Sequence, residues 1–136
     1  MDYIYADFNG ITSLLEDDAF ECLDLTGYGT LQSLNFLQIK LKEGMEFIFY
    51  EPGDIEVVAE VFFDRTTKSQ ITTKGRWLAK FKKGTIRNCK KLDQFETHPC
   101  FNCREDFGPY LKKVGMRYKE NCPKCGTSIL YPLTVP

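Results

Sequence analysis

The sequence predicts an all-β, mainly antiparallel fold in two parts. A small β-barrel-like or sandwich domain is expected at residues 1–94, and a smaller C-terminal domain at residues 95–136. Short apolar runs of strand length recur along the first part, and turn signals separate them. Two cysteine pairs of the same spacing mark the second part. With 136 residues, of which 43% are hydrophobic, the chain is long enough for one packed core with a small appendage.

The clearest strands lie in the middle of the chain. Residues 45–50 and 55–63 are apolar runs joined by the turn signal Pro52-Gly53. Residues 76–82 alternate with a period of two, which predicts a strand with one buried face. The side chains of that face are Trp77, Ala79 and Phe81, and those of the opposite face are Arg76, Lys80 and Lys82. A further turn leads into a last predicted strand at residues 85–89.

The first 44 residues give weaker signals. Three strands are expected there, at residues 3–8, 22–26 and 37–41. A short helical turn is expected within residues 11–20, because Thr12 or Ser13 could cap it. The apolar positions between residues 31 and 41 follow neither a helical nor a strand period consistently, and we interpret their end as a strand. Residues 66–75 and 90–97 are predicted to be loops.

Four cysteines near the C-terminus form two Cys-x-x-Cys pairs separated by 18 residues. The pairs are Cys100 with Cys103 and Cys122 with Cys125. Zn²⁺ prefers thiolate ligands in a tetrahedron, and two intervening residues let both sulfurs of a pair face one point. Pro123 and Gly126 favour such a turn in the second pair, whereas the first pair has Arg104 where glycine is expected. The spacing therefore predicts one zinc ion.

This segment resembles a zinc ribbon, of which the sequence Cys-Pro-Lys-Cys-Gly is typical. The resemblance covers roughly residues 96–136. It implies that all four cysteines are ligands, and that residues 127–131 form a closing strand. A full shell of four thiolates leaves no position for a reacting water, so the zinc is expected to be structural. Zinc ribbons occur in proteins of many functions, so the resemblance leaves the function open.

The cysteines and the histidine could also have other roles. Two disulfides are a poorer expectation, since no signal peptide precedes the chain and we expect a reducing cytoplasmic location. A redox centre would need a βαβ pattern that is not visible. His98, the only histidine, could replace one of the cysteines as a ligand or support the site from outside, but we interpret it as a loop residue packed beside Pro99. Cys22 and Cys89 lie outside the motif and are expected to be buried thiols.

Charge is segregated along the chain although the formal net charge is only −1. Residues 1–63 hold 13 acidic and two basic residues, and residues 65–91 hold ten basic residues and no acidic one. Such a pattern predicts either two opposed electrostatic faces or charges that pair across neighbouring strands. No apolar run is long enough to cross a bilayer. Nothing in the sequence predicts an oligomeric state.

Two binding functions fit this pattern, and we favour the first. The acidic half, together with side chains expected to be exposed, suits a protein partner, as in an adaptor, an accessory subunit or an immunity (inhibitor) protein. Those side chains are Tyr3, Tyr5, Tyr28, Phe47 and Tyr50. The alternative is nucleic-acid binding through the basic segment 65–91 and the ribbon. Its candidate residues are Arg76, Lys80, Lys82, Lys83 and Arg87.

Stacking of bases on Trp77 and Phe81 would support the alternative, but their alternation favours burial in the core. An enzyme is the least favoured reading. One histidine beside a cysteine cluster is poor material for a nucleophile and base, and Gly27-Tyr28-Gly29 is too short for a phosphate loop. We therefore expect no catalytic residues.

Overall fold

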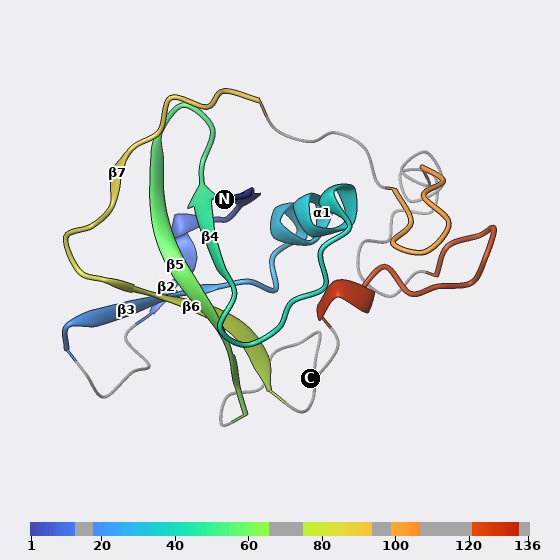
Figure 1. The fold of residues 1–136 in the computed structure, drawn as a ribbon, viewed down its shortest axis with the longest axis horizontal. Helices are drawn as coiled ribbons and strands as arrows, with labels where there is room; N and C mark the ends of the chain where they lie inside the picture. The colour runs from blue at the N-terminus through green and yellow to red at the C-terminus, as the bar shows by residue number, and fades with distance from the viewer. Residues whose placement is uncertain (13–17, 66–74, 94–98, 107–120, 134–136) are drawn as a thin grey trace.

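The computed structural model describes residues 1–12, 18–65, 75–93, 99–106 and 121–133. Within them, one mixed sheet of seven strands lies beside one α-helix (Figure 1). The sheet order is β1-β4-β5-β6-β3-β2, and β7 pairs with β5. The strands are β1 (Tyr3–Tyr5), β2 (Ile11–Thr12), β3 (Phe20–Asp24), β4 (Glu46–Tyr50), β5 (Ile55–Asp64), β6 (Arg76–Lys82) and β7 (Arg87–Asn88).

The middle of the sheet confirms the sequence reading. β4 and β5 form an antiparallel pair around the predicted turn, where Gly53 has the positive φ of 68° that favours glycine. β6 has the predicted bounds and pairs with β5 on one side and β3 on the other. Across these strands Val61 lies opposite Ala79, and Phe63 lies opposite Trp77. All four are buried, so this face of the sheet forms the core.

The prediction of an all-β, mainly antiparallel fold is confirmed only in part and is wrong at one element, because residues Tyr28–Leu37 form an α-helix, α1. Leu31 and Leu34 are three residues apart, on one helical face, and both are fully buried. Gly27 is the N-cap of this helix, and Gln38 ends it in the left-handed conformation with φ 59°. Residues 37–41 are therefore the end of a helix and an irregular segment, not a strand.

The sheet is open, so the barrel prediction is wrong as well. β1 pairs in parallel with β4, whereas every other strand pair is antiparallel. α1 lies against β1. The backbone N–H of Tyr5 donates to Ser33 Oγ at 3.1 Å, and the Thr30 hydroxyl donates to the Tyr5 carbonyl at 2.7 Å. A Cβ on Gly29 would come within 2.4 Å of the Tyr5 ring, so this close approach requires glycine.

Two smaller elements need comment. Ile11 and Thr12 form β2, because they pair with Leu23 and Cys22 of β3, and the helical turn expected within residues 11–20 would fall mainly on residues 13–17. The closing strand expected at residues 127–131 is reduced to one isolated bridge between Asn121 and Ser128, and a 3₁₀ turn, Tyr131–Leu133, follows it. Residues 13–17 and the loop at 66–74 lie outside the described residues.

The two parts of the chain are joined by hydrogen bonds. Trp77 Nε1 donates to the Leu133 carbonyl at 3.1 Å, and the Leu41 N–H donates to the Pro132 carbonyl at 3.1 Å. Ile129 and Leu133 belong to the same buried cluster as the sheet residues. The division into domains at residue 94 stays a prediction, since residues 94–98 lie outside the described part. No helix in the described part is long and apolar enough to span a membrane.

Candidate metal centre

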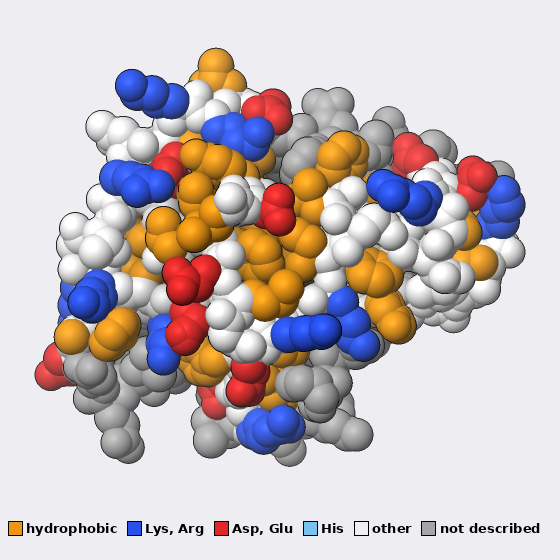
Figure 2. Space-filling view, viewed as in Figure 1, with side chains coloured by type: hydrophobic (Ala, Val, Ile, Leu, Met, Phe, Trp, Pro, Cys, Tyr) orange, Lys and Arg blue, Asp and Glu red, His pale blue; other side chains and the backbone are white. Residues whose placement is uncertain are grey.

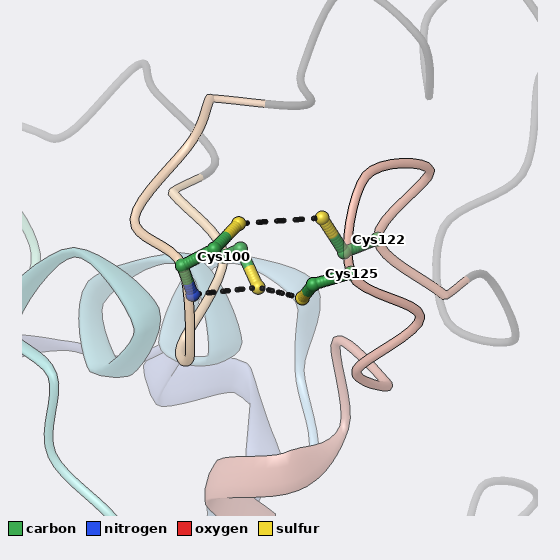
Figure 3. Close-up of side chains that lie close together, drawn as sticks. Cys100, Cys122 and Cys125 are labelled. Atoms are coloured by element: carbon green, nitrogen blue, oxygen red, sulfur yellow. Dashed lines mark hydrogen bonds between the residues drawn. The ribbon is translucent and has the colours of Figure 1, made fainter.

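The four cysteines of the two Cys-x-x-Cys pairs converge on one point, and their sulfur atoms all lie within 4.8 Å of one another. Cys100 Sγ lies 3.4 Å from Cys125 Sγ, and Cys103 Sγ lies 3.7 Å from Cys122 Sγ. Each close contact therefore joins one pair to the other. Figure 3 shows the side chains of Cys122 and Cys125 pointing toward the loop that carries Cys100.

This geometry fits a tetrahedral thiolate site. Zinc–sulfur bonds of about 2.3 Å place the sulfurs of a tetrahedral site about 3.8 Å apart. The observed sulfur separations are close to this value, and all four ligand atoms are thiol sulfurs, which zinc prefers. The four residues thus form a candidate metal centre of the kind found in a zinc ribbon.

The two cysteine loops have the same backbone construction. The N–H of Cys100 donates to the Glu105 carbonyl, and the N–H of Cys122 donates to the Thr127 carbonyl, each at 2.8 Å. The carbonyls of the same two cysteines accept from Arg104 and Gly126. Isolated bridges close the loops, Pro99 with Asp106 and Asn121 with Ser128. The site therefore consists of two equivalent turns, each presenting two sulfurs.

Arg104 occupies the position that Gly126 occupies in the second turn. Both have positive φ, 64° for Arg104 and 81° for Gly126. The first cysteine pair, which has arginine where glycine is expected, therefore forms the same turn as the second pair, and Arg104 adopts a strained backbone conformation in it. A left-handed conformation costs a residue with a Cβ about 1–2 kcal/mol.

Arg104→Gly is expected to raise the free energy of unfolding of the zinc-loaded protein by up to about 1 kcal/mol, because it relieves this strain. Gly126→Ala should lower it by a similar amount. A Cβ at position 126 meets no atom of the described residues within 4 Å, so only the backbone conformation is tested. Urea denaturation of both variants measures the effect. If both substitutions changed the free energy of unfolding in the same direction, the two cysteine turns would not be equivalent.

The four sulfurs differ in exposure and in acidity. Cys100 and Cys122 are buried, Cys103 is half-buried and Cys125 is exposed. Burial raises the pKa of the Cys100 thiol to about 12. Hydrogen bonds from the hydroxyl and the backbone of Thr127 lower the pKa of Cys125 to about 6. Since a thiol binds a metal as thiolate, Cys125 is ready at neutral pH, whereas Cys100 must release a proton on metal binding.

The site rests on the end of α1, through two residues that the sequence reading did not single out. Gln38 Nε2 donates to the Cys100 carbonyl at 3.2 Å, and Asn35 Nδ2 donates to the Ile129 carbonyl at 3.2 Å. Asn35 is fully buried. The only sequence signal was two amide side chains three residues apart at the end of an apolar segment, which is not specific.

Cys22 and Cys89, the two cysteines without the Cys-x-x-Cys spacing, do not belong to this cluster. His98 falls outside the described residues. Cys22 and Cys89 are buried, as predicted. Burial raises the pKa of Cys22 to about 11. Cys89 Sγ lies 3.6 Å from the Lys91 carbonyl.

The basic candidates for nucleic-acid binding are not gathered into one free surface. Arg76 pairs with Asp24 at 2.6 Å, and Lys80 lies 3.9 Å from Glu60. Arg87 pairs with Glu56 at 2.7 Å. In each pair a base of the second half meets an acid of the first, so part of the charge segregation is resolved by pairing across strands. Lys82 and Lys83 are exposed.

The aromatic side chains considered for stacking or for a partner contact offer little exposed surface. Trp77 and Phe81 are buried, as their alternation predicted. Phe47 and Tyr50, expected to be exposed for a partner, are buried as well, because Phe47 faces the core and Tyr50 is covered by its neighbours. Tyr50 contacts the rings of Tyr3 and Tyr5 edge-on. Tyr3, Tyr5 and Tyr28 are half-buried.

The chain matches no protein-family model, no curated protein and no solved structure. The likeness to a zinc ribbon therefore depends on the four cysteines and on the geometry of their two turns.

Proposed function

We propose that the protein is a non-enzymatic, zinc-containing binding module that engages a basic protein partner. The observation that carries the zinc assignment is the convergence of four thiol sulfurs on one point. Four thiolates complete the coordination shell of Zn²⁺ and leave no site for a reacting water. The metal would then stabilise the fold rather than take part in a reaction, and Cys100, Cys103, Cys122 and Cys125 would hold it.

The metal content of the protein tests the assignment of a zinc ion to the four cysteines. The purified protein is expected to contain one zinc ion per chain. Replacement by Co²⁺ should give the absorption of a tetrahedral thiolate site, in proportion to the cobalt added. Protein purified under reducing conditions that takes up neither metal would contradict the assignment.

The partner class follows from the end of the sheet that carries the β4–β5 turn, residues 51–54. The stretch after β7 lies against this turn, since the Gly53 N–H donates to the Lys91 carbonyl at 2.7 Å. Leu92 in this stretch is 78% exposed, the most exposed large hydrophobic residue of the described part. Acids flank it, since Asp93 follows Leu92 and Asp54 lies in the turn.

We call this end, made of Asp54, Leu92 and Asp93, the acidic end. Leu92 lies over the turn residue Gly53, next to Asp54. An apolar side chain between acidic residues suits a partner with an apolar contact and surrounding lysines or arginines, because opposite charges steer association and fix its orientation.

Charge reversal tests the acidic end. Asp54→Lys together with Asp93→Lys is expected to abolish recovery of a stoichiometric basic protein from native lysate. Glu46→Lys is the matched control. It changes an exposed acid at the opposite end of β4, beside Glu60 of β5, and should keep the partner. Equal recovery with both variants, or no stoichiometric basic protein with the unchanged chain, would contradict the proposal.

A reducing compartment such as the cytoplasm suits this function. All six cysteines are free thiols, and the candidate metal centre needs four of them in the reduced state.

Nucleic-acid binding remains the second candidate, and one observation favours it. Lys82, Lys83 and Lys90 are exposed on the turn between β6 and β7 and beyond it, and none of them forms an ion pair with another described residue. On the face drawn in Figure 2, acidic and basic side chains are interspersed around a hydrophobic centre, so that face carries no extended cationic groove.

If nucleic acid is bound, changing Lys82, Lys83 and Lys90 to Ala is expected to weaken it and to reduce the slope of log K against log salt by about 0.7–0.9 per lysine that contacts a phosphate. Fluorescence anisotropy with labelled single-stranded and duplex DNA and with RNA measures this. Lys80→Ala, two residues from Lys82 on the same strand but beside Glu60, is the control and should change little. No binding at low salt would remove this candidate.

A further inference from the structure

The last turn of α1 contacts both halves of the candidate metal centre. Gln38 Nε2 donates to the Cys100 carbonyl at 3.2 Å and to the Asn35 carbonyl at 2.8 Å. The Cys100 carbonyl also accepts from the Arg104 N–H at 3.0 Å, which closes the first cysteine turn. Gln38 therefore joins the helix to the turn that positions the first two sulfurs.

Gln38 has a conformation that glycine would adopt more easily. Its φ of 59° is left-handed, and its N–H caps the helix by bonding to the Asn35 carbonyl. Helices commonly end in this way with glycine. A side chain at this position costs free energy, and here the side chain makes the bond to Cys100.

Asn35 makes the corresponding contact with the second half. Its Nδ2 donates to the Leu31 carbonyl at 3.0 Å and to the Ile129 carbonyl at 3.2 Å. Among the described residues its Oδ1 has no hydrogen-bond partner although it is buried. An amide in the core is costly unless its bonds are kept, so the contact with Ile129 depends on that segment staying in place.

The segment after the second cysteine pair continues into the core of the sheet. Pro132 accepts from Leu41, and Leu133 accepts from Trp77 Nε1, at 3.1 Å each. Cys100, Cys122, Ile129 and Leu133 belong to one buried cluster with the residues of α1 and β6. The candidate metal centre and the sheet therefore share a single core.

We propose that Gln38 and Asn35 couple the metal centre to the sheet, so that metal occupancy controls whether residues 129–133 stay packed on α1 and Trp77. The proposal rests on the zinc-binding function above. The described parts of residues 99–133 hold little regular structure besides a 3₁₀ turn and two isolated bridges. Without the metal, little else holds the two cysteine turns together, and the carbonyls bonded to Asn35, Gln38 and Trp77 move away with them.

Trp77 is the only tryptophan of the chain and reports this change directly. Its ring is fully buried, and its Nε1 bonds to the C-terminal segment. Removal of Zn²⁺ from the full chain with EDTA, under reducing conditions, is expected to shift the Trp77 emission to longer wavelength. Hydrogen exchange of α1 should increase together with this shift, and both changes should reverse when Zn²⁺ is returned.

Gln38→Gly distinguishes an effect of the Gln38 side chain on zinc affinity from an effect on the stability of the fold. Glycine suits the left-handed cap, so the metal-free variant should be at least as stable as the metal-free unchanged protein. Loss of the side chain should nevertheless weaken zinc affinity about 10-fold, as is common for groups that orient metal ligands. A purely structural role predicts unchanged zinc affinity. Lys80→Ala, which removes a surface ion pair with Glu60 on the sheet, away from the cysteine turns, is the control and should leave affinity nearly unchanged.

The outcomes are distinguishable. No zinc uptake contradicts the proposed function and this proposal with it. Full zinc uptake, followed by complete removal with unchanged Trp77 emission and unchanged α1 exchange, overturns only this proposal. So does unchanged zinc affinity in Gln38→Gly.

Discussion

Cys122→Ser is expected to abolish zinc binding and to unfold the C-terminal part of the chain. Cys122 is buried, and its sulfur lies 3.7 Å from that of Cys103, so the substitution removes one of four converging ligands. Structural zinc contributes about 10–16 kcal/mol of apparent binding free energy in small zinc-finger peptides, which is also folding free energy. A loss on this scale exceeds what a small segment can recover from its own core.

Zinc content and hydrogen exchange of residues 99–106 and 121–133 measure the effect. Cys89→Ser is the matched control, because it changes a buried thiol that lies outside the cluster. That variant should retain one zinc per chain. Unchanged protection in a zinc-free Cys122→Ser variant would show that the ion is incidental to the fold, and full zinc content in that variant would show that Cys122 is not a required ligand.

Trp77→Ala is expected to lower the free energy of unfolding by about 3–5 kcal/mol, the usual cost of removing a buried aromatic ring. Trp77 is fully buried, stacks edge-on against Phe63 at 5.2 Å, and bonds to the Leu133 carbonyl. Since small proteins are stable by only about 5–15 kcal/mol, the variant should be close to unfolding. Urea denaturation of the zinc-loaded protein, followed by circular dichroism, measures it.

Trp77→Phe separates the contribution of ring packing from that of the hydrogen bond to the Leu133 carbonyl. It keeps most of the ring packing but leaves the Leu133 carbonyl without its donor, which costs about 1–3 kcal/mol. The expected order of stability is therefore unchanged protein, Trp77→Phe, Trp77→Ala. A loss below about 1 kcal/mol in the alanine variant would mean that the C-terminal segment does not pack on this residue as described.

The parts of the fold that depend on local pattern were predictable. β6 alternates strictly between core and opposite-face residues, and its bounds were predicted without error. β4 and β5 are apolar runs around a Pro-Gly turn, which brings neighbours in sequence together. The four cysteines were predictable for the same reason, since the spacing within each pair determines its turn.

The helix and the strand pairing were harder to predict because they depend on distant contacts. α1 has a glycine at its N-cap without a side-chain bond and another glycine inside, so its helical propensity is low. Burial of Leu31 and Leu34 under the core compensates for this. The parallel pairing of β1 with β4 joins segments more than 40 residues apart, and no local signal marks it.

The ion pairs could not be predicted from the sequence for a similar reason. The sequence shows that acids precede bases, but not which ones meet. The pairs Asp24–Arg76 and Glu56–Arg87 follow from the order of the strands in the sheet. The link from Gln38 to Cys100 depends on how the C-terminal part packs on α1, which no pattern in the sequence records.

The contact of α1 with β1 also bears on self-association. An unpaired strand at the edge of a sheet offers free N–H and C=O groups to which a strand of another molecule can add. β1 is only three residues long, and both backbone groups of its last residue, Tyr5, are already bonded to side chains of α1. By bonding these two groups, the helix hinders the addition of a strand from another molecule and so opposes edge-to-edge aggregation. Ser33→Ala and Thr30→Val together should make the protein more prone to form β-rich aggregates, even where its zinc site is intact.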